Sequence, residues 1–368
     1  MKKLCWCYVL FCFIINSNAI AQSGLEKIIV EKYYISTAKD TAGADSTGYL
    51  PIGSVTYRIF ADLQPVYRLQ AVYGVPEHEL RIETTTRFFN AAVGDGRSAN
   101  DVQPMMLVKG ALLLDSWVTV GAAAVDFIGV LKVDDDSVKS YGANNVQGIL
   151  KNNAPEMGIP LTEKDGMKYL RYQPATQYYN LENDLKIFEY QHKDSVKGLF
   201  STRDGAWASY GGSVGPQPDN RILIAQLTTD GVLSFELNMQ LAVPNGGVEK
   251  FVAKNPGEEE VEFPELRFSS SPGNKAPMVS LAGPDLKKLS SPQILEFTAL
   301  ANDPDGKIGS VDFYINDKLV AMDMEAPYVF KYNYVGQGVK VSVTAVDVKG
   351  ARTRSDDFML PTLKKQGD

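Results

Sequence analysis

Residues 303–330 read DPDGKIGSVDFYINDKLVAMDMEAPYVF, and residues 341–351 read VSVTAVDVKGA. In both stretches apolar side chains recur at every second position, which predicts β-strands with one face in a core. Asp303–Gly306 and Asn316-Asp317 have the composition of turns, because Asp and Asn hydrogen-bond their own backbone and Gly accepts a positive φ. Short strands separated by turns predict a small β-sandwich at the end of the chain. The inward-facing side chains are expected to be Leu295, Phe297 and Ala299, then Val311, Phe313 and Ile315, and then Val339, Val341 and Val343.

The same stretches resemble the bacterial Ig-like modules of secreted and carbohydrate-active proteins. In that family an Asp-x-Asp-Gly turn precedes a V-x-F-Y strand, an Ala-Pro-Tyr or Ala-Pro-Phe segment follows, and an A-x-D-x-x-G stretch closes the sandwich. Here these features stand at Asp303–Gly306 with Val311–Tyr314, at Ala326–Tyr328 and at Ala345–Gly350. The resemblance implies an Ig-like domain over 277–361 that acts as a spacer, an adhesive unit or a carbohydrate-binding accessory.

The chain before this module is also predicted to consist mainly of strands. Val232–Leu241 alternates apolar and polar residues, and a Thr-Thr-Asp-Gly segment joins it to Ile222–Leu227, so the two runs are expected to form a hairpin. Ser54–Leu63 alternates in a similar way. Further expected strands are Gln70–Tyr73, Leu80–Thr86 and Ser116–Val120.

We therefore predict an all-β chain of two domains. A jelly-roll-like β-sandwich of unknown function is expected over 22–268, because many short strands without a sustained helical period favour a sandwich over α/β layers. A linker over 269–276 follows, since Ser, Gly and Pro bury little apolar surface. The Ig-like domain over 277–361 and a tail over 362–368 complete the chain.

The first domain resembles the N-terminal region of uncharacterised secreted proteins of Bacteroidota. The resemblance rests on VTYRIFADL at 55–63, LQAVYGVPEHELRIETTTRFFN at 69–90, LDSWVTVGAA at 114–123 and RILIAQLTTDG at 221–231. It implies a secreted bacterial protein and brings no activity with it.

Residues 1–21 have the three parts of a secretory signal peptide. Lys2 and Lys3 supply the positive charge, Leu4–Ile15 is apolar but too short to span a bilayer, and Ala19-Ile20-Ala21 offers a cleavage site. All three cysteines lie in this segment, so the secreted chain is expected to contain no disulfide. Secretion without disulfides favours the periplasm, cell surface or extracellular space of a Gram-negative bacterium.

The net charge bears on the partners of the protein. Removing Lys2 and Lys3 changes the formal charge from −7 to −9. An acidic surface argues against nucleic acid as a partner and is compatible with a glycan or an envelope protein. No later segment is apolar for long enough to span a membrane, so we expect no membrane span.

Two groups of residues are candidates for ligand or metal binding. Trp207 and Tyr210 lie in the glycine-rich stretch DGAWASYGG, and aromatic rings on a loop can stack on sugars, although a Trp more often anchors a core. The resemblance implies that Asp303, Asp305 and Asp347 lie in turns at one end of the Ig-like sandwich. Their carboxylates would suit Ca²⁺, although Asp-x-Asp-Gly is also an ordinary turn.

No catalytic residue is predicted. Gly211–Gly215 matches G-x-S-x-G, but Pro216 and Pro218 oppose the helix that a nucleophile elbow needs. The two histidines, His78 and His192, both precede that serine and are too few for a three-His zinc site.

The leading hypothesis is a secreted, non-catalytic binding or adhesion protein of the bacterial cell envelope, with a glycan or a protein as its ligand. One alternative is a carbohydrate-active enzyme with an Ig-like accessory module. Another is a structural subunit of an envelope assembly.

Overall fold

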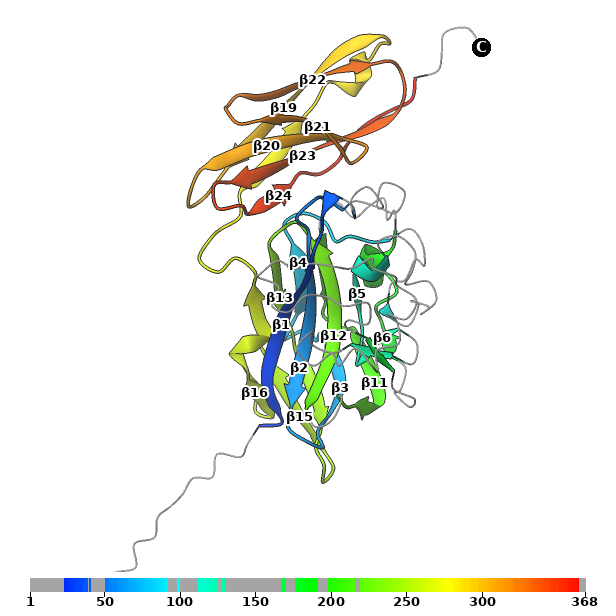
Figure 1. Cartoon of the computed structure of the whole chain (residues 1–368), viewed down its shortest axis with the longest axis vertical. Coiled ribbons are helices and arrows are strands. Elements are labelled where there is room, and N and C mark those ends of the chain that lie inside the picture. Colours follow the sequence, from blue (N-terminus) through cyan, green and yellow to red (C-terminus); the bar gives the residue numbers. More distant parts are fainter. Residues whose placement is uncertain are drawn as a thin grey trace, which may run out of the picture.

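Strands make up most of the regular structure in the computed structural model, which confirms the predicted all-β class (Figure 1). The predicted signal peptide lies outside the residues that the structure describes. Those residues are 23–38, 40, 50–91, 98–99, 112–124, 127–129, 167–169, 176–190, 198–215 and 219–363.

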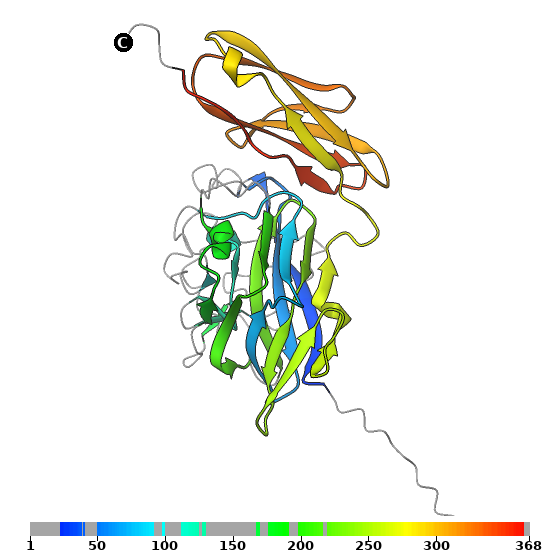
Figure 2. The same ribbon diagram turned by 180° about the vertical axis from the view of Figure 1, so that it is seen from behind.

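The N-terminal part of the chain consists of sheets on two sides of one core. The first layer has the antiparallel order β1-β2-β12-β5. The second layer, seen from behind in Figure 2, contains the sheets β10-β4-β13-β17 and β16-β15-β14-β3-β11-β9. The strands of the first layer are β1 (Leu25–Ile35), β2 (Val55–Leu63), β12 (Asn220–Thr229) and β5 (Trp117–Val118). Those of the second are β3 (Arg68–Tyr73), β4 (Leu80–Thr84), β9 (Thr176–Tyr179), β10 (Gly198–Thr202), β11 (Ala206–Ser213), β13 (Leu233–Glu236), β14 (Met239–Ala242), β15 (Val248–Val252), β16 (Glu260–Glu262) and β17 (Arg267–Ser269).

The described residues of this part of the chain also form smaller elements. A three-stranded sheet contains β6 (Ala122–Ala124), β7 (Phe127–Gly129) and β8 (Met167–Tyr169). Short 3-10 helices are η3 (Leu112–Leu114), η7 (Asp184–Phe188) and η8 (Pro264–Leu266).

Alternating side chains from both layers bury one hydrophobic core. Ile59 of β2 and Ile224 of β12 meet Leu69, Phe200 and Trp207 of the opposite layer in this cluster, and all five are fully buried. Burial of this kind contributes roughly 1.5–3 kcal/mol for each large side chain. The core therefore stabilises this part of the chain without a disulfide.

The predicted hairpin between Ile222–Leu227 and Val232–Leu241 is wrong. β12 pairs with β2 and β5, whereas β13 pairs with β4 and β17, so the chain crosses between layers at Asp230-Gly231. The expected ten-residue strand is also divided into β13 and β14. The division falls at Asn238, whose side-chain amide donates to the carbonyls of Tyr73 and His78. A side chain that satisfies neighbouring backbone groups replaces regular strand pairing at this point.

The C-terminal sandwich has the predicted strands and inward faces. One sheet has the order β18-β19-β22 and the other β21-β20-β23-β24, with β25 also paired to β23. Leu295, Phe297, Val311, Phe313 and Val341 are buried between them. The strands are β18 (Met278–Ala282), β19 (Gln293–Asn302), β20 (Ile308–Ile315), β21 (Lys318–Asp323), β22 (Tyr328–Tyr334), β23 (Val339–Asp347), β24 (Arg352–Arg354) and β25 (Phe358–Leu360), with a 3-10 helix η9 (Leu286–Lys288).

Hydrogen bonds and ion pairs join the two sandwiches, and Figure 1 shows β24 on the side of the Ig-like sandwich that faces the N-terminal part. The amide of Arg354 donates to the carbonyl of Thr85 at 2.9 Å. The guanidinium of Arg352 lies 3.2 Å from the carboxylate of Asp230. Asp230, predicted to belong to a hairpin turn, instead holds the second sandwich against the first.

A second group of charges at this interface surrounds Arg87 of the N-terminal part. Its guanidinium pairs with Asp357 and, at 3.3 Å, with Asp317. Asp317 also pairs with Arg354 at 2.6 Å and with Lys340. Burial raises the pKa of Asp317, but the charges of Arg354, Arg87 and Lys340 outweigh that effect and lower it. We refer to these five side chains as the Arg87 network.

Candidate functional site

Trp207 is a core residue rather than a platform for a sugar. It lies in β11, its side chain is fully buried, and its ring meets Phe200 edge-on with the centroids 5.9 Å apart. A sugar can stack only on an exposed ring face, so the assignment of Trp207 to a ligand site is corrected. Its burial agrees with the alternative interpretation, that Trp207 anchors the core.

Tyr210, in contrast, projects into solvent with 87% of its surface exposed. Along β11 the register against β3 jumps from Ala208, opposite Ala71, to Ser213, opposite Leu69. The extra residues leave the ladder as a bulge, which carries Tyr210 outward. Gly212 follows with φ of +76°, and a Cβ there would lie 2.6 Å from the Cβ of Arg68, so only Gly fits the turn. Tyr210 and Trp207 therefore do not form one surface.

The G-x-S-x-G segment has no exposed nucleophile. Ser213 is fully buried, and its hydroxyl donates to the carbonyl of Val120 at 3.1 Å. The neighbouring amide of Gly215 donates to the side chain of Asn220 at 2.7 Å. Through these contacts the segment connects β11 to the first layer.

His78 forms a buried pair with a carboxylate that the sequence spacing did not reveal. Its Nε2 lies 2.7 Å from Oε2 of Glu260, on the edge strand β16. The same carboxylate oxygen accepts the amide of Gly257 at 2.8 Å. Burial, together with the charge of Glu260, raises the pKa of the nearby Tyr73 to about 12, so its phenol stays protonated at alkaline pH values where an ordinary tyrosine ionises. The second histidine, His192, lies outside the described residues.

The acidic turns of the Ig-like sandwich are held by hydrogen bonds within the chain. Asp347 is buried; Oδ1 accepts the amides of Lys349 and Ala351, and Oδ2 accepts from the side chain of Asn274 at 2.7 Å. Asp305 accepts the amide of Lys275 at 3.1 Å, and Asp303 accepts the amide of Asp305. In the described part of the chain, no group of three or more acidic, His or Cys side chains is arranged to hold a metal ion.

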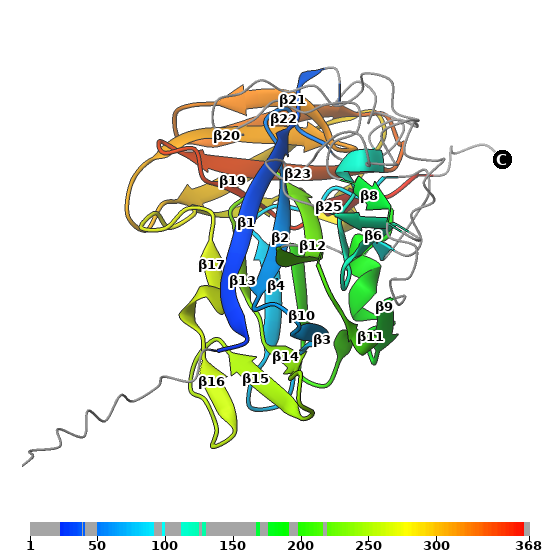
Figure 3. The ribbon, with the colours of Figure 1, turned by 60° about the horizontal axis from the view of Figure 1, so that its bottom comes forward.

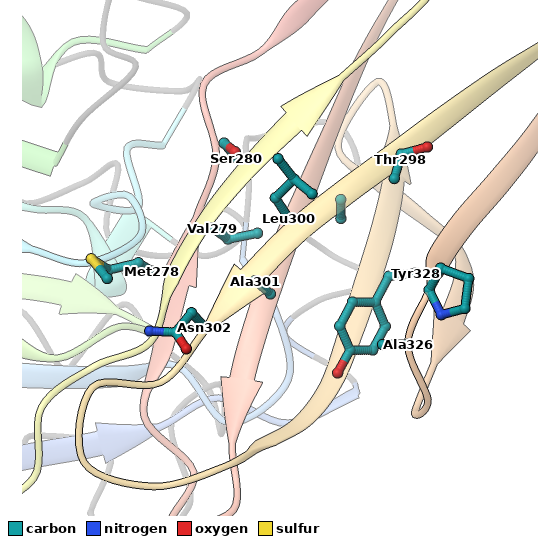
Figure 4. Close-up of a pocket in the computed structure, with 11 residues that line it drawn as sticks. Met278, Val279, Ser280, Thr298, Leu300, Ala301, Asn302, Ala326 and Tyr328 are labelled. Carbon is teal, nitrogen blue, oxygen red and sulfur yellow. The ribbon is translucent and has the colours of Figure 1, made fainter.

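An open groove of about 500 Å³ lies on the sheet β18-β19-β22, where no site residue was predicted (Figure 4). β22 pairs with β19 only as far as Tyr328 opposite Ala299, whereas β19 continues to Asn302 and pairs there with β18 alone. Among the described residues, the side of Leu300–Asn302 toward β22 therefore has no partner strand. Ala326 and Pro327 also line the groove.

The side chains along this groove are mainly apolar. Leu300 is 65% exposed and Met278 of β18 is 58% exposed. The ring of Tyr328, which lies beside Ala326 in Figure 4, is nine-tenths buried. An apolar surface beside an unpaired strand edge suits an extended peptide, which can bind through both its main chain and its side chains. We call this surface, defined by Met278, Leu300, Ala326, Pro327 and Tyr328, the β19 groove.

The sequence holds one signal for the groove. In QILEFTALAN, Leu300 interrupts the polar set of an otherwise alternating strand, as Ile294 does at the start. The alternation places both side chains outward, but it does not say which of them lies beside a missing strand.

Residues 277–350 match the family described as Bacterial Ig domain. Among solved structures, the fibronectin(III)-like modules of Clostridium thermocellum CbhA are 30% identical, with a TM-score of 0.21, over 24% of this chain and 100% of that chain. The PKD1 domain of Vibrio anguillarum Epp is 19% identical, with a TM-score of 0.20, over 24% of this chain and 99% of that chain. No curated protein matches the chain.

The family match shows a bacterial Ig-like domain at the predicted place. Domains of this family are typical of extracellular or surface proteins, which indicates a surface-associated binding or accessory module. In the described part of the chain, no helix has the length and apolar character needed to cross a bilayer. The similarity of the first domain to Bacteroidota proteins stays a prediction.

Proposed function

We propose that this is a secreted, non-catalytic binding protein of the bacterial cell envelope and that its ligand is a protein. The β19 groove carries the proposal, because it combines an unpaired strand edge with exposed apolar side chains. A glycan site usually offers aromatic faces and polar groups that converge on hydroxyls. The groove instead offers Met278 and Leu300, while Tyr328 keeps its ring in the core.

The position of the groove, away from the contacts between the two domains, also supports a role in binding. Contacts of Asp230 with Arg352 and of Thr85 with Arg354 hold the Ig-like sandwich on the first domain through the opposite sheet. The sheet that carries the groove is not the one used in these contacts. A partner can therefore dock on β19 while the two domains stay together.

The test compares Leu300→Glu with Ile294→Glu. Both side chains point outward from β19, with 65% and 69% of their surfaces exposed, but only Leu300 lines the groove. Polypeptides selected on the secreted protein from a displayed peptide library would be synthesised and titrated against each variant. We expect Leu300→Glu to weaken binding by about tenfold or more and Ile294→Glu to change it by less than about twofold.

A glycan array on the same protein, with calcium present, provides the opposing measurement. Saturable glycan binding that Leu300→Glu leaves unchanged, together with no selected peptide, would overturn the proposal. Circular dichroism of both variants shows whether the sandwich is folded, and both substitutions are expected to preserve it because each side chain is exposed.

A further inference from the structure

We propose that β21 is a self-association edge, through which two copies of this protein pair their Ig-like sheets in antiparallel register. β21 is the outer strand of its sheet, as Figure 3 shows, and in the described part of the chain it pairs only with β20. Its other edge therefore presents unpaired backbone groups, which can accept a further strand.

The side chains of this edge are unusually apolar for an exposed strand. Leu319, Val320 and Met322 are between 44% and 58% exposed, and Met324 just beyond the strand is 69% exposed. Charged side chains stand only at the two ends, at Lys318 and Asp323. Natural edge strands are commonly protected by central charges, by proline or by a β-bulge. β21 has no central charge and no proline, and a bulge at Val320 is the one such feature that it carries.

Two other open edges in the described structure, β22 and β16, have such protection. β22 pairs only with β19, and Lys331 lies at its centre, so an antiparallel copy would place Lys331 opposite itself. β16 carries Glu260 and Glu262 at an edge of the N-terminal sheet. Like charges directly opposite each other destabilise strand pairing. The contrast distinguishes β21 from these edges.

The sequence of β21, Lys-Leu-Val-Ala-Met-Asp, is complementary to itself when read in the opposite direction. A two-fold axis between Val320 and Ala321 places Lys318 of one copy opposite Asp323 of the other. The same axis places Leu319 opposite Met322. Symmetry repeats each pair, so the interface gains two ion pairs and two apolar pairs. This complementarity of charge identifies a second copy of the chain as the occupant.

The shape of the strand is consistent with a symmetric partner. Against β20 the register shifts between Phe313 and Tyr314, which leaves Val320 as an extra residue in β21. Such a bulge increases the local twist of the strand that carries it. A second β21 has the same twist, because it has the same bulge.

Association through a single six-residue strand is expected to be weak. The contact falls below the roughly 1,600 Å² of a standard interface, so we expect a Kd on the order of 100 µM. Sedimentation equilibrium of the secreted protein from about 1 µM to about 1 mM covers that range.

Charge variants test the register. Lys318→Asp places Asp opposite Asp, and Asp323→Lys places Lys opposite Lys, twice in each dimer. Each variant alone is expected to weaken association by about tenfold or more. An equimolar mixture of the two restores opposite charges in a heterodimer, and the double variant restores them in a homodimer. Both are expected to associate as the unsubstituted protein does.

Two further variants make the test decisive. Lys331→Asp makes the same charge change on β22 and is expected to leave association unchanged. Met322→Lys leaves intact the hydrogen bond from the amide of Glu325 to Asp323, and it is expected to weaken association even if Asp323→Lys fails to fold. A monomer over the whole concentration range, or equal effects of Lys318→Asp and Lys331→Asp, would overturn the proposal.

Discussion

Replacing Arg87 by Met is expected to uncouple the two domains. The side chain of Arg87 is 14% exposed and pairs with Asp357 and Asp317 of the Ig-like sandwich. Breaking a fully buried ion pair costs roughly 3–5 kcal/mol, whereas an exposed pair contributes about 0–1 kcal/mol. Both aspartates keep other cations, since Lys340 lies near each of them. We therefore expect Arg87→Met to reduce the free energy that couples the two domains by about 1–3 kcal/mol, between these limits.

The chain provides separate signals for its two domains. Of its three tryptophans, Trp117 and Trp207 lie in the N-terminal core and Trp6 lies in the predicted signal peptide. Tryptophan fluorescence therefore follows the first domain during urea unfolding, whereas far-ultraviolet circular dichroism follows both domains. In the unsubstituted protein the two signals are expected to change together. In Arg87→Met the circular dichroism should begin to change before the fluorescence, at a urea concentration lower by roughly 0.3–1 M.

Arg203→Met is the matched control. Arg203 is 65% exposed and pairs with Glu79 at 3.2 Å within the first domain, so its loss is expected to cost less than about 1 kcal/mol. The reasoning fails if Arg87→Met unfolds with the same midpoints and the same coincident transitions as Arg203→Met. In that case the Arg87 network would not couple the domains.

Three other predictions concern single residues. The folded-state pKa of Asp317 lies below its unfolded value, so its stabilising effect is present above the unfolded pKa and is lost as pH falls through the folded pKa. Asp317→Asn should therefore reduce the loss of domain coupling at acid pH, as urea unfolding across that pH range would show. Trp207→Ala should lower the free energy of unfolding by about 3–5 kcal/mol, whereas Tyr210→Ala should change it by less than about 0.5 kcal/mol, as chemical denaturation would show. If Asp347 binds calcium, millimolar Ca²⁺ should raise the melting temperature of the protein and EDTA should reverse the rise. If Asp347 is purely structural, neither addition should change the melting temperature, and Asp347→Ala should be destabilising in EDTA as well, because its hydrogen bonds to Lys349 and Ala351 are lost.

Local patterns identified which side chains face a core. Leu233, Phe235, Met239 and Leu241 are all buried, although they belong to two strands in different sheets. Alternation depends only on the geometry of consecutive residues, so it survives the break between β13 and β14. The same holds for the turn at Asn316-Asp317, where both residues adopt the positive φ that such residues tolerate.

Strand partners could not be predicted in the same way. The runs that were expected to form a hairpin lie in different layers, because their partners are chosen by contacts between distant residues. Thr229 of β12, for example, meets the side chain of Thr84, which lies 145 positions away in the chain. Proximity in sequence favours a hairpin but does not require one.

The sequence by itself determined the all-β class, the place of the Ig-like domain and the inward face of most strands, since these follow from the spacing of residues along a short backbone segment. The tertiary structure alone decided that Trp207 is buried while Tyr210 projects, that Arg87 joins the two domains, and that β19 extends beyond β22 to leave a groove. Each of these features depends on the relative lengths and registers of strands that are remote in sequence. Long-range packing sets those registers, and no local pattern encodes it.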